Sequence, residues 1–133
     1  MSPRIEISLW HAFIGLAIGV GLSSSGGEPE PKMLLWGLGA CTFGAWIGGL
    51  LFAGAYGKPG YFGWGEALVA ALLSVAVGGA VGGTCIVPVI GTVLGPIFLF
   101  QLSFESPLAA LAVLLAFATI HLRARSIRGR VPA

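Results

Sequence analysis

The chain has 133 residues, of which 56% are hydrophobic and 9% are charged, and its mean hydropathy is +0.96. A soluble domain has about a quarter of its residues charged, so this chain has too few charges to cover a globular surface in water. The composition excludes an ordinary soluble domain and predicts an all-α, polytopic membrane protein with a single integral membrane domain. The net charge is only +2, and no basic stripe alternates with aromatic residues, so we expect no nucleic-acid partner.

The first apolar segment, 5–22, is predicted to be a transmembrane helix that the protein retains. It follows Arg4, as the apolar part of a signal peptide would follow a basic residue, but no cleavage site of the Ala-x-Ala type comes after it. Residues 23–31 are rich in Ser, Gly, Glu and Pro. Such a cluster cannot continue a helix and favours water or lipid headgroups. We therefore expect a turn there.

The second apolar segment, 33–56, contains 24 residues and no charge. A helix of that length measures about 36 Å, which is enough to cross the hydrocarbon core with some tilt. In the connector 57–64 that follows, Tyr61 and Trp64 fit the aromatic belt of a membrane interface. A third span is predicted over 66–87. A fourth is predicted over 107–122, where Ser106 fits the N-cap and Pro107 the first helical position.

The stretch 88–104 is too apolar for an ordinary loop, yet it contains Pro88, Gly91, Gly95 and Pro96, which interrupt a helix. Three interpretations fit these residues. The stretch is a re-entrant or interfacial segment, a kinked continuation of the third span, or a fifth short span.

The distribution of charge favours four transmembrane helices over five. With four spans, Arg4, Lys58 and the basic tail 123–133 share one side of the membrane, which follows the positive-inside tendency. We therefore predict a bacterial inner-membrane protein with both termini in the cytoplasm, and we interpret 88–104 as a broken re-entrant or interfacial segment. The four arginines of the tail are predicted to orient the protein in the membrane and to contact anionic lipid headgroups. They are Arg123, Arg125, Arg128 and Arg130.

Small residues recur every four positions in the first three spans, so each of these helices has one face with little side-chain bulk. Helices in lipid associate through such Gly-x-x-x-Gly faces because their backbones can approach closely. These faces would pack against one another or against another protein. The predicted helix-packing residues are Gly15, Gly19, Gly44, Gly48, Gly49, Ser74, Gly78, Gly82 and Gly83.

Two of these strings, Gly44-Ala45-Trp46-Ile47-Gly48-Gly49 and Gly79-Ala80-Val81-Gly82-Gly83, resemble a Gly-Ala…Gly-Gly helix found in the transglycosylase-associated family of small bacterial membrane proteins. The resemblance covers roughly a third of the chain. It implies a short, glycine-rich, helical membrane protein. It implies no catalytic or binding residue.

Two histidines, His11 and His121, are candidate ligands of a haem or of a chlorophyll-type pigment, because imidazole on a helix is a common axial ligand of such groups. The alternative is a structural role, in a hydrogen bond to a neighbouring helix or as a cation at a helix C-terminus. Glu6 and Glu66 are each expected in the first turn of a helix, where the helix dipole favours an anion.

We expect no other cofactor and no metal site, since Cys41 and Cys85 do not form a Cys-x-x-Cys motif. No catalytic motif is recognisable either, so the chain is not predicted to be an enzyme. These features predict a small structural or accessory subunit that docks through its glycine faces into a larger inner-membrane complex, with other integral membrane proteins and lipids as partners. The alternative is a homo-oligomeric channel or transporter with a pore lined by 88–104, which offers the polar side chains of Thr92, Gln101 and Ser103.

Overall fold

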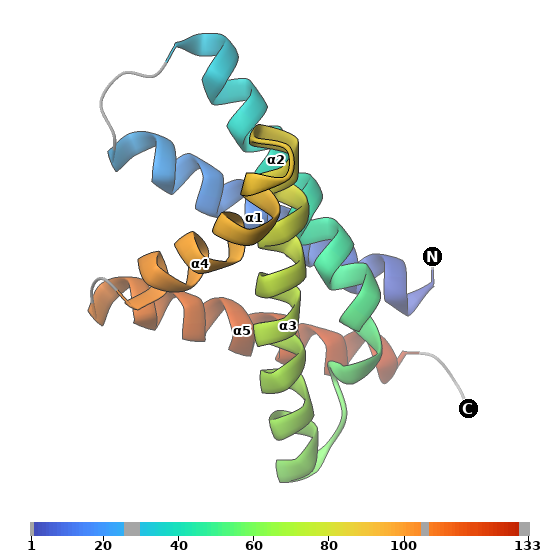
Figure 1. Ribbon diagram of the computed structural model, residues 1–133. Helices are drawn as coiled ribbons and strands as arrows, with labels where there is room; N and C mark the ends of the chain where they lie inside the picture. The colour runs from blue at the N-terminus through green and yellow to red at the C-terminus, as the bar shows by residue number, and fades with distance from the viewer. Residues whose placement is uncertain (1, 26–29, 105–106, 131–133) are drawn as a thin grey trace.

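The computed structural model describes residues 2–25, 30–104 and 107–130, and no strand occurs within these ranges. The helices of this part of the chain cross one another at several angles (Figure 1). In chain order the elements are α1 (Pro3–Ser25), α2 (Pro31–Phe52), the short 3-10 helix η1 (Ala53–Ala55), α3 (Gly60–Ile86), α4 (Ile90–Phe104) and α5 (Pro107–Arg128). The predicted all-α fold is confirmed.

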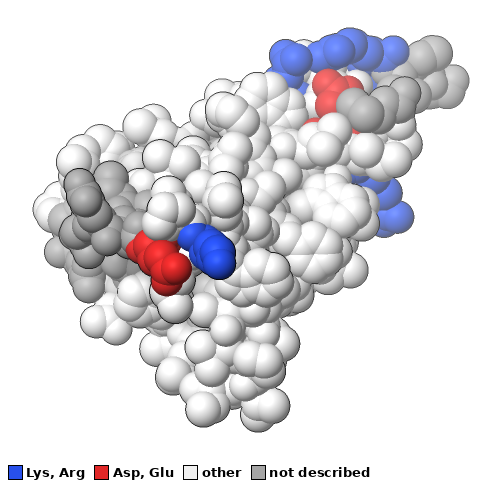
Figure 2. Space-filling view, turned by 90° about the horizontal axis from the view of Figure 1, so that it is seen from above, with Lys and Arg blue, Asp and Glu red and all other residues white. Residues whose placement is uncertain are grey.

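Four segments of these helices are long and apolar enough to cross a membrane: Pro3–Gly21, Pro31–Ala55, Gly60–Ile86 and Ala110–Arg128. The distribution of charged side chains fits this division into long apolar segments. In Figure 2 the charged side chains in view gather at separate places, and the surface between them is white. The chain is therefore a polytopic membrane protein with four such helices, as the sequence predicts.

The chain termini lie at the same end of the molecule (Figure 1). There α5 runs beside the first turns of α1: the Arg123 guanidinium lies 5.5 Å from the centre of the Trp10 ring, and a nitrogen of Arg130 lies 4.0 Å from a carboxylate oxygen of Glu6. Glu6 is in the first turn of α1, as predicted. This arrangement is the one that an even number of membrane crossings produces.

The third helix begins at Gly60 rather than near 66. Pro59 has an extended backbone with ψ 161°, and Gly60 has a φ of +77°, which a residue without a Cβ adopts easily. These two residues turn the chain directly into α3. Glu66 therefore lies beyond the first turn, contrary to the prediction, and forms an ion pair with Lys58 instead.

The last helix continues to Arg128 rather than ending at 122, so most of the predicted basic tail is helical. The reason is burial on one side of these turns. Ile120, Ala124 and Ile127 are buried in the same cluster as Ile7 and Tyr56, and a helix keeps this spacing on one face. Arg123, Arg125 and Arg130 remain exposed.

The predicted break in 88–104 is confined to its first residues. Val87 is extended and Val89 has a φ of +68°, so the chain reverses there. The expectation of irregular backbone is wrong for Ile90–Phe104, which forms the helix α4 with Pro96 inside it. At about 22 Å, α4 is shorter than the hydrocarbon core, and it folds back against α3.

The predicted turn 23–31 is shorter than expected at both ends. Ser23 to Ser25 belong to α1. Pro31 is the first residue of α2, where its missing N–H costs no hydrogen bond because the first N–H groups of a helix have no partner within it. Residues 26–29 of this turn lie outside the described residues, and so does the predicted N-cap Ser106.

Glycine–backbone contacts join consecutive helices. A Cβ on Gly48 of α2 would lie 2.5 Å from the Ser74 carbonyl oxygen of α3, and one on Gly78 would lie 2.9 Å from the Gly44 carbonyl oxygen. Gly82 meets the Ala40 carbonyl oxygen in the same way, at 2.9 Å. No side chain fits at these distances, so α2 and α3 touch backbone to backbone.

Glycines also form the contact between α1 and α2 and the contact between α3 and α4. In α1, a Cβ on Gly15 would lie 2.7 Å from the Cys41 carbonyl oxygen, and one on Gly19 would lie 3.3 Å from the Cys41 side chain. In α3, Gly83 faces the Gly91 carbonyl oxygen of α4. The predicted packing glycines are therefore largely used between helices of this chain.

Candidate functional site

A cavity of about 390 Å³ lies among α1, α2, α3, α4 and α5. It is large because the residues that face it are small. Ala112 and Ala116 of α5 line one side, and Ala45 of α2 and Ala71 of α3 are among the residues that line the rest. Short side chains on facing helices leave space that longer ones would fill. The volume falls in the range of small-molecule sites.

Three polar side chains also line this cavity: His11, Tyr56 and Ser74. All three are buried, with 6%, 1% and 6% of their surfaces exposed. The His11 and Tyr56 rings pack edge to face with their centres 4.9 Å apart. The Ser74 hydroxyl donates to the Gly48 carbonyl oxygen at 3.3 Å.

Tyr56 follows η1 and lies beyond the apolar span Pro31–Ala55. Burial raises the pKa of its phenol to about 12, because the charged form loses its hydration there. Tyr56 therefore keeps its proton at neutral pH. The Ser74 hydroxyl donates its proton to the Gly48 carbonyl oxygen and therefore does not donate to His11.

His11 has one satisfied ring nitrogen and one unsatisfied one. Nδ1 lies 3.0 Å from the Ile7 carbonyl oxygen; since a carbonyl only accepts, Nδ1 is the nitrogen that carries the proton. In the neutral ring Nε2 is then an acceptor, and it is buried without a hydrogen-bond partner. A buried polar atom in this state costs about 1–3 kcal/mol.

Gly49 holds the His11 ring in place. A Cβ at Gly49 would lie 2.5 Å from the His11 Cβ and 2.7 Å from Nδ1, so any side chain there would displace the ring. The predicted packing residue Gly49 therefore positions a histidine, while its neighbour Gly48 packs against backbone.

The second histidine, His121, lies elsewhere. Its Nδ1 accepts a bond from the Gly57 N–H at 3.4 Å, and its ring packs against Trp64 with the centres 4.2 Å apart. Trp64, predicted for the interfacial belt, therefore packs inward, whereas Tyr61 is exposed. His11 lines the cavity and His121 does not. Within the described ranges, no three His, Cys, Asp or Glu side chains are grouped to hold a metal ion.

Arg128 differs from the other arginines predicted to contact headgroups. Its Nε donates to the Tyr56 carbonyl oxygen at 2.8 Å, and its Nη2 donates to the carbonyl oxygens of Ala53 and Gly54 at 3.1 and 2.9 Å. A cation at this position also interacts favourably with the helix dipole. Arg128 therefore fastens the end of α5 to the end of α2.

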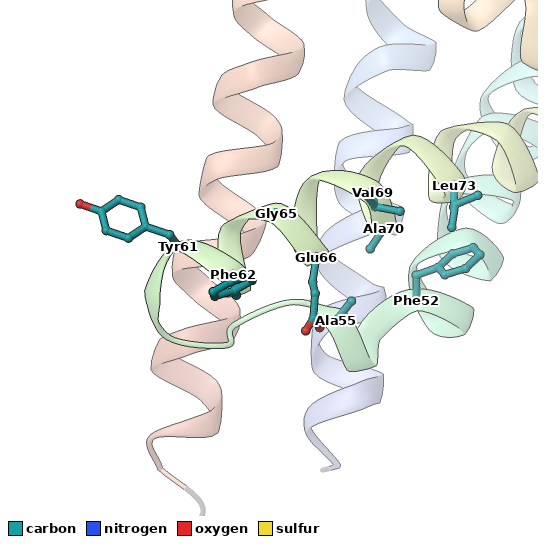
Figure 3. A pocket seen from close by; sticks show the side chains of 9 residues that line it. All are labelled: Phe52, Ala55, Tyr61, Phe62, Gly65, Glu66, Val69, Ala70 and Leu73. Atoms are coloured by element: carbon teal, nitrogen blue, oxygen red, sulfur yellow. The ribbon is translucent and has the colours of Figure 1, made fainter.

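An open apolar groove lies near the start of α3 (Figure 3). Its volume is about 570 Å³. Tyr61 and Phe62 are 95% and 91% exposed, and in the figure Tyr61 points away from the neighbouring helices. The groove is lined by Phe52, Ala55, Tyr61, Phe62, Gly65, Glu66, Val69, Ala70 and Leu73.

Two of the three polar residues proposed for a pore in 88–104, Thr92 and Gln101, lie on the surface of α4. Thr92 is exposed, and its hydroxyl is hydrogen bonded to that of Thr84 at 2.6 Å. Gln101 is exposed as well. The side chain of Ser103 lies outside the described part of the chain.

Sequence reasoning identified His11 and Ser74 but missed Tyr56 and the cavity-lining alanines of α5. Tyr56 stands at the end of an apolar segment, where a tyrosine is ordinarily an interfacial residue. The alanines sit in a leucine-rich helix without any polar mark. The spacing of Ala112 and Ala116, four residues apart, is the signal that was available.

No family model, no curated protein and no solved structure matches this chain.

Proposed function

We propose that this chain is a small, non-catalytic subunit that joins a larger assembly of integral membrane proteins. The observation that carries the proposal is a pair of open glycines on α2. A Cβ added to Gly37 or Gly39 would meet no atom within 4 Å. Both lie in an apolar span, and Gly39 is exposed.

Glycine is a poor helix former, with a cost of about 1 kcal/mol relative to alanine. Inside this chain, glycines such as Gly44 and Gly48 offset that cost through close helix contact, whereas Gly37 and Gly39 have no such contact. Glycines on a lipid-facing helix surface allow a helix of another protein to approach closely. The proposed docking surface is therefore the face of α2 that contains Gly39, and the glycine pairs of the core are not part of it. Gly37, two positions earlier, lies on another side of the same helix.

The proposed location is a bacterial inner membrane with both termini in the cytoplasm. Arg123, Arg125 and Arg130 support it, because they are exposed at the end of the molecule where both termini lie. Basic side chains there would contact anionic headgroups and retain this end on the cytoplasmic side.

The test is isolation of the protein in mild detergent, followed by mass spectrometry of the proteins that co-purify in fixed ratio. We expect Gly39→Leu to lose these partners. Gly65→Leu is the matched control, since a Cβ at Gly65 also meets nothing within 4 Å but lies on α3; it should retain them. Both variants should fold, because leucine favours a helix more than glycine does.

Equal recovery of partners with wild type and Gly39→Leu would contradict this docking surface. A chain that purifies without partners and conducts ions or solutes in proteoliposomes would contradict the accessory role and favour a homo-oligomeric channel or transporter.

A further inference from the structure

We propose that the cavity beneath α5 binds a membrane-soluble small molecule whose O–H or N–H group donates a hydrogen bond to Nε2 of His11. This inference is independent of the proposed assembly role. It rests on a buried acceptor without a partner, on the shape and lining of the space beside it, and on the lack of a donor among the neighbouring side chains.

The chemistry of the polar end selects a donor. Nδ1 of His11 carries the ring proton because it faces the Ile7 carbonyl oxygen at 3.0 Å. Nε2 therefore presents a lone pair, and it lies in a side chain that is 6% exposed and has no partner at this atom. A ligand carbonyl or ether would repel this lone pair. A hydroxyl, phenol or amine would bond to it.

Water alone does not suit this position. A buried water needs two to four polar partners. The Ser74 hydroxyl already donates to the Gly48 carbonyl oxygen. The rest of the lining is almost entirely apolar, with side chains such as Ile14, Val75 and Phe117. An apolar body that carries a single donor matches the lining better than solvent does.

The cavity reaches the lipid-facing surface of the helices. Ile18 of α1 and Val113 of α5 line it and are 42% and 39% exposed. A molecule dissolved in the membrane can therefore enter between α1 and α5 without passing through the polar end. Membrane solubility is then part of the ligand class that the structure favours.

The test uses two probes that differ by one donor. 1-Aminoanthracene has a rigid apolar body with one amine, and anthracene has the same body without it. The purified chain in lipid nanodiscs is titrated with each, and energy transfer from the protein tryptophans reports binding above that of nanodiscs without protein. We expect saturable binding of both, with 1-aminoanthracene about five- to tenfold tighter, as one hydrogen bond provides.

Three variants distinguish the contribution of the hydrogen bond to binding from that of the cavity volume. His11→Phe keeps a ring beside Tyr56 but removes Nε2, so it should equalise the two affinities. Ala116→Leu narrows the cavity and should weaken the saturable binding of both probes. Leu115→Ala, on the adjacent exposed position of the same helix, is the matched control and should change neither. Helix content and a single size-exclusion peak verify that each variant folds.

The wild-type titration decides the matter even where a variant fails to fold. Equal affinities of the two probes for the wild-type chain would overturn the proposal, because the donor would then find no acceptor. A preference for 1-aminoanthracene that survives in His11→Phe would overturn it too. Unchanged affinities of both probes for Ala116→Leu would place the probes at another site and overturn the proposal.

Discussion

The contact between α2 and α3 predicts that Gly48→Ala destabilises the fold. The new Cβ would lie 2.5 Å from the carbonyl oxygen and 3.2 Å from the carbonyl carbon and Cα of Ser74. All three are backbone atoms, so no side-chain rotation relieves the overlap, and the two helices must separate. Separation also strains the bond from the Ser74 hydroxyl to the Gly48 carbonyl oxygen.

The magnitude follows from three contributions. Overpacking a helix contact costs about 1–3 kcal/mol, and a hydrogen bond between membrane helices contributes about 0.6 kcal/mol. Replacing glycine by alanine in a helix returns about 1 kcal/mol. The net loss for Gly48→Ala is therefore about 0.6–2.6 kcal/mol. Gly39→Ala, where the Cβ meets nothing within 4 Å, should be neutral or more stable.

Unfolding of the purified protein by SDS in mixed micelles, followed by circular dichroism, measures both variants against wild type. The comparison between the two variants is the informative one, because the helix-propensity gain is shared and the steric term is not. If Gly48→Ala proves as stable as Gly39→Ala, the backbone contact between α2 and α3 is refuted. The glycines of these helices would then require another explanation.

Three further predictions concern other parts of the molecule. Arg128→Gln should lower the free energy of unfolding by about 1–2 kcal/mol in the same SDS assay, since bonds from a charged donor to three carbonyls are lost, whereas the exposed Arg125→Gln should change it little. The purified protein should show no Soret band, because His121 does not line the cavity that His11 faces; a band that disappears in His11→Phe would contradict this. The raised pKa of Tyr56 contributes stability that is present below pH 10 and is lost as pH rises through about 12. The free energy of unfolding should therefore fall less steeply with pH in Tyr56→Phe than in wild type over this range. Equal pH profiles would refute the burial of this phenol.

The class of fold and the number of long apolar helices could be predicted because they depend on composition and length. The ends of the helices could not, because they depend on contacts distant in sequence. Residues 123–128 read as a basic tail, yet Ala124 and Ile127 are buried against η1 and α1, and this burial extends α5. The start of α3 depends on the positive φ of Gly60, which the sequence shows only as one of three glycines in the connector 57–64.

The candidate site was predicted in part, for the same physical reason. His11 was predicted as a candidate ligand, and its four-residue spacing from Gly15 and Gly19 puts it on their helix face. The structure directs its ring toward α2, against Gly49. Its pairing with His121 was an inference from membrane depth alone. Depth does not determine which rings face one another, and here each histidine packs against a different aromatic residue, Tyr56 or Trp64.

The cavity and the glycine contacts are two consequences of one property, the distance at which helices meet. Consecutive helices from α1 to α4 contact one another through glycines, so their backbones approach closely at these contacts. Helix α5 contains no glycine, and its side chains toward the other helices include Ala112 and Ala116. A Cβ prevents the closest approach, but a methyl group does not fill the gap that results. The helix that cannot approach closely is therefore the one that encloses the cavity, and a donor-bearing ligand beside His11 would occupy the space that this packing leaves.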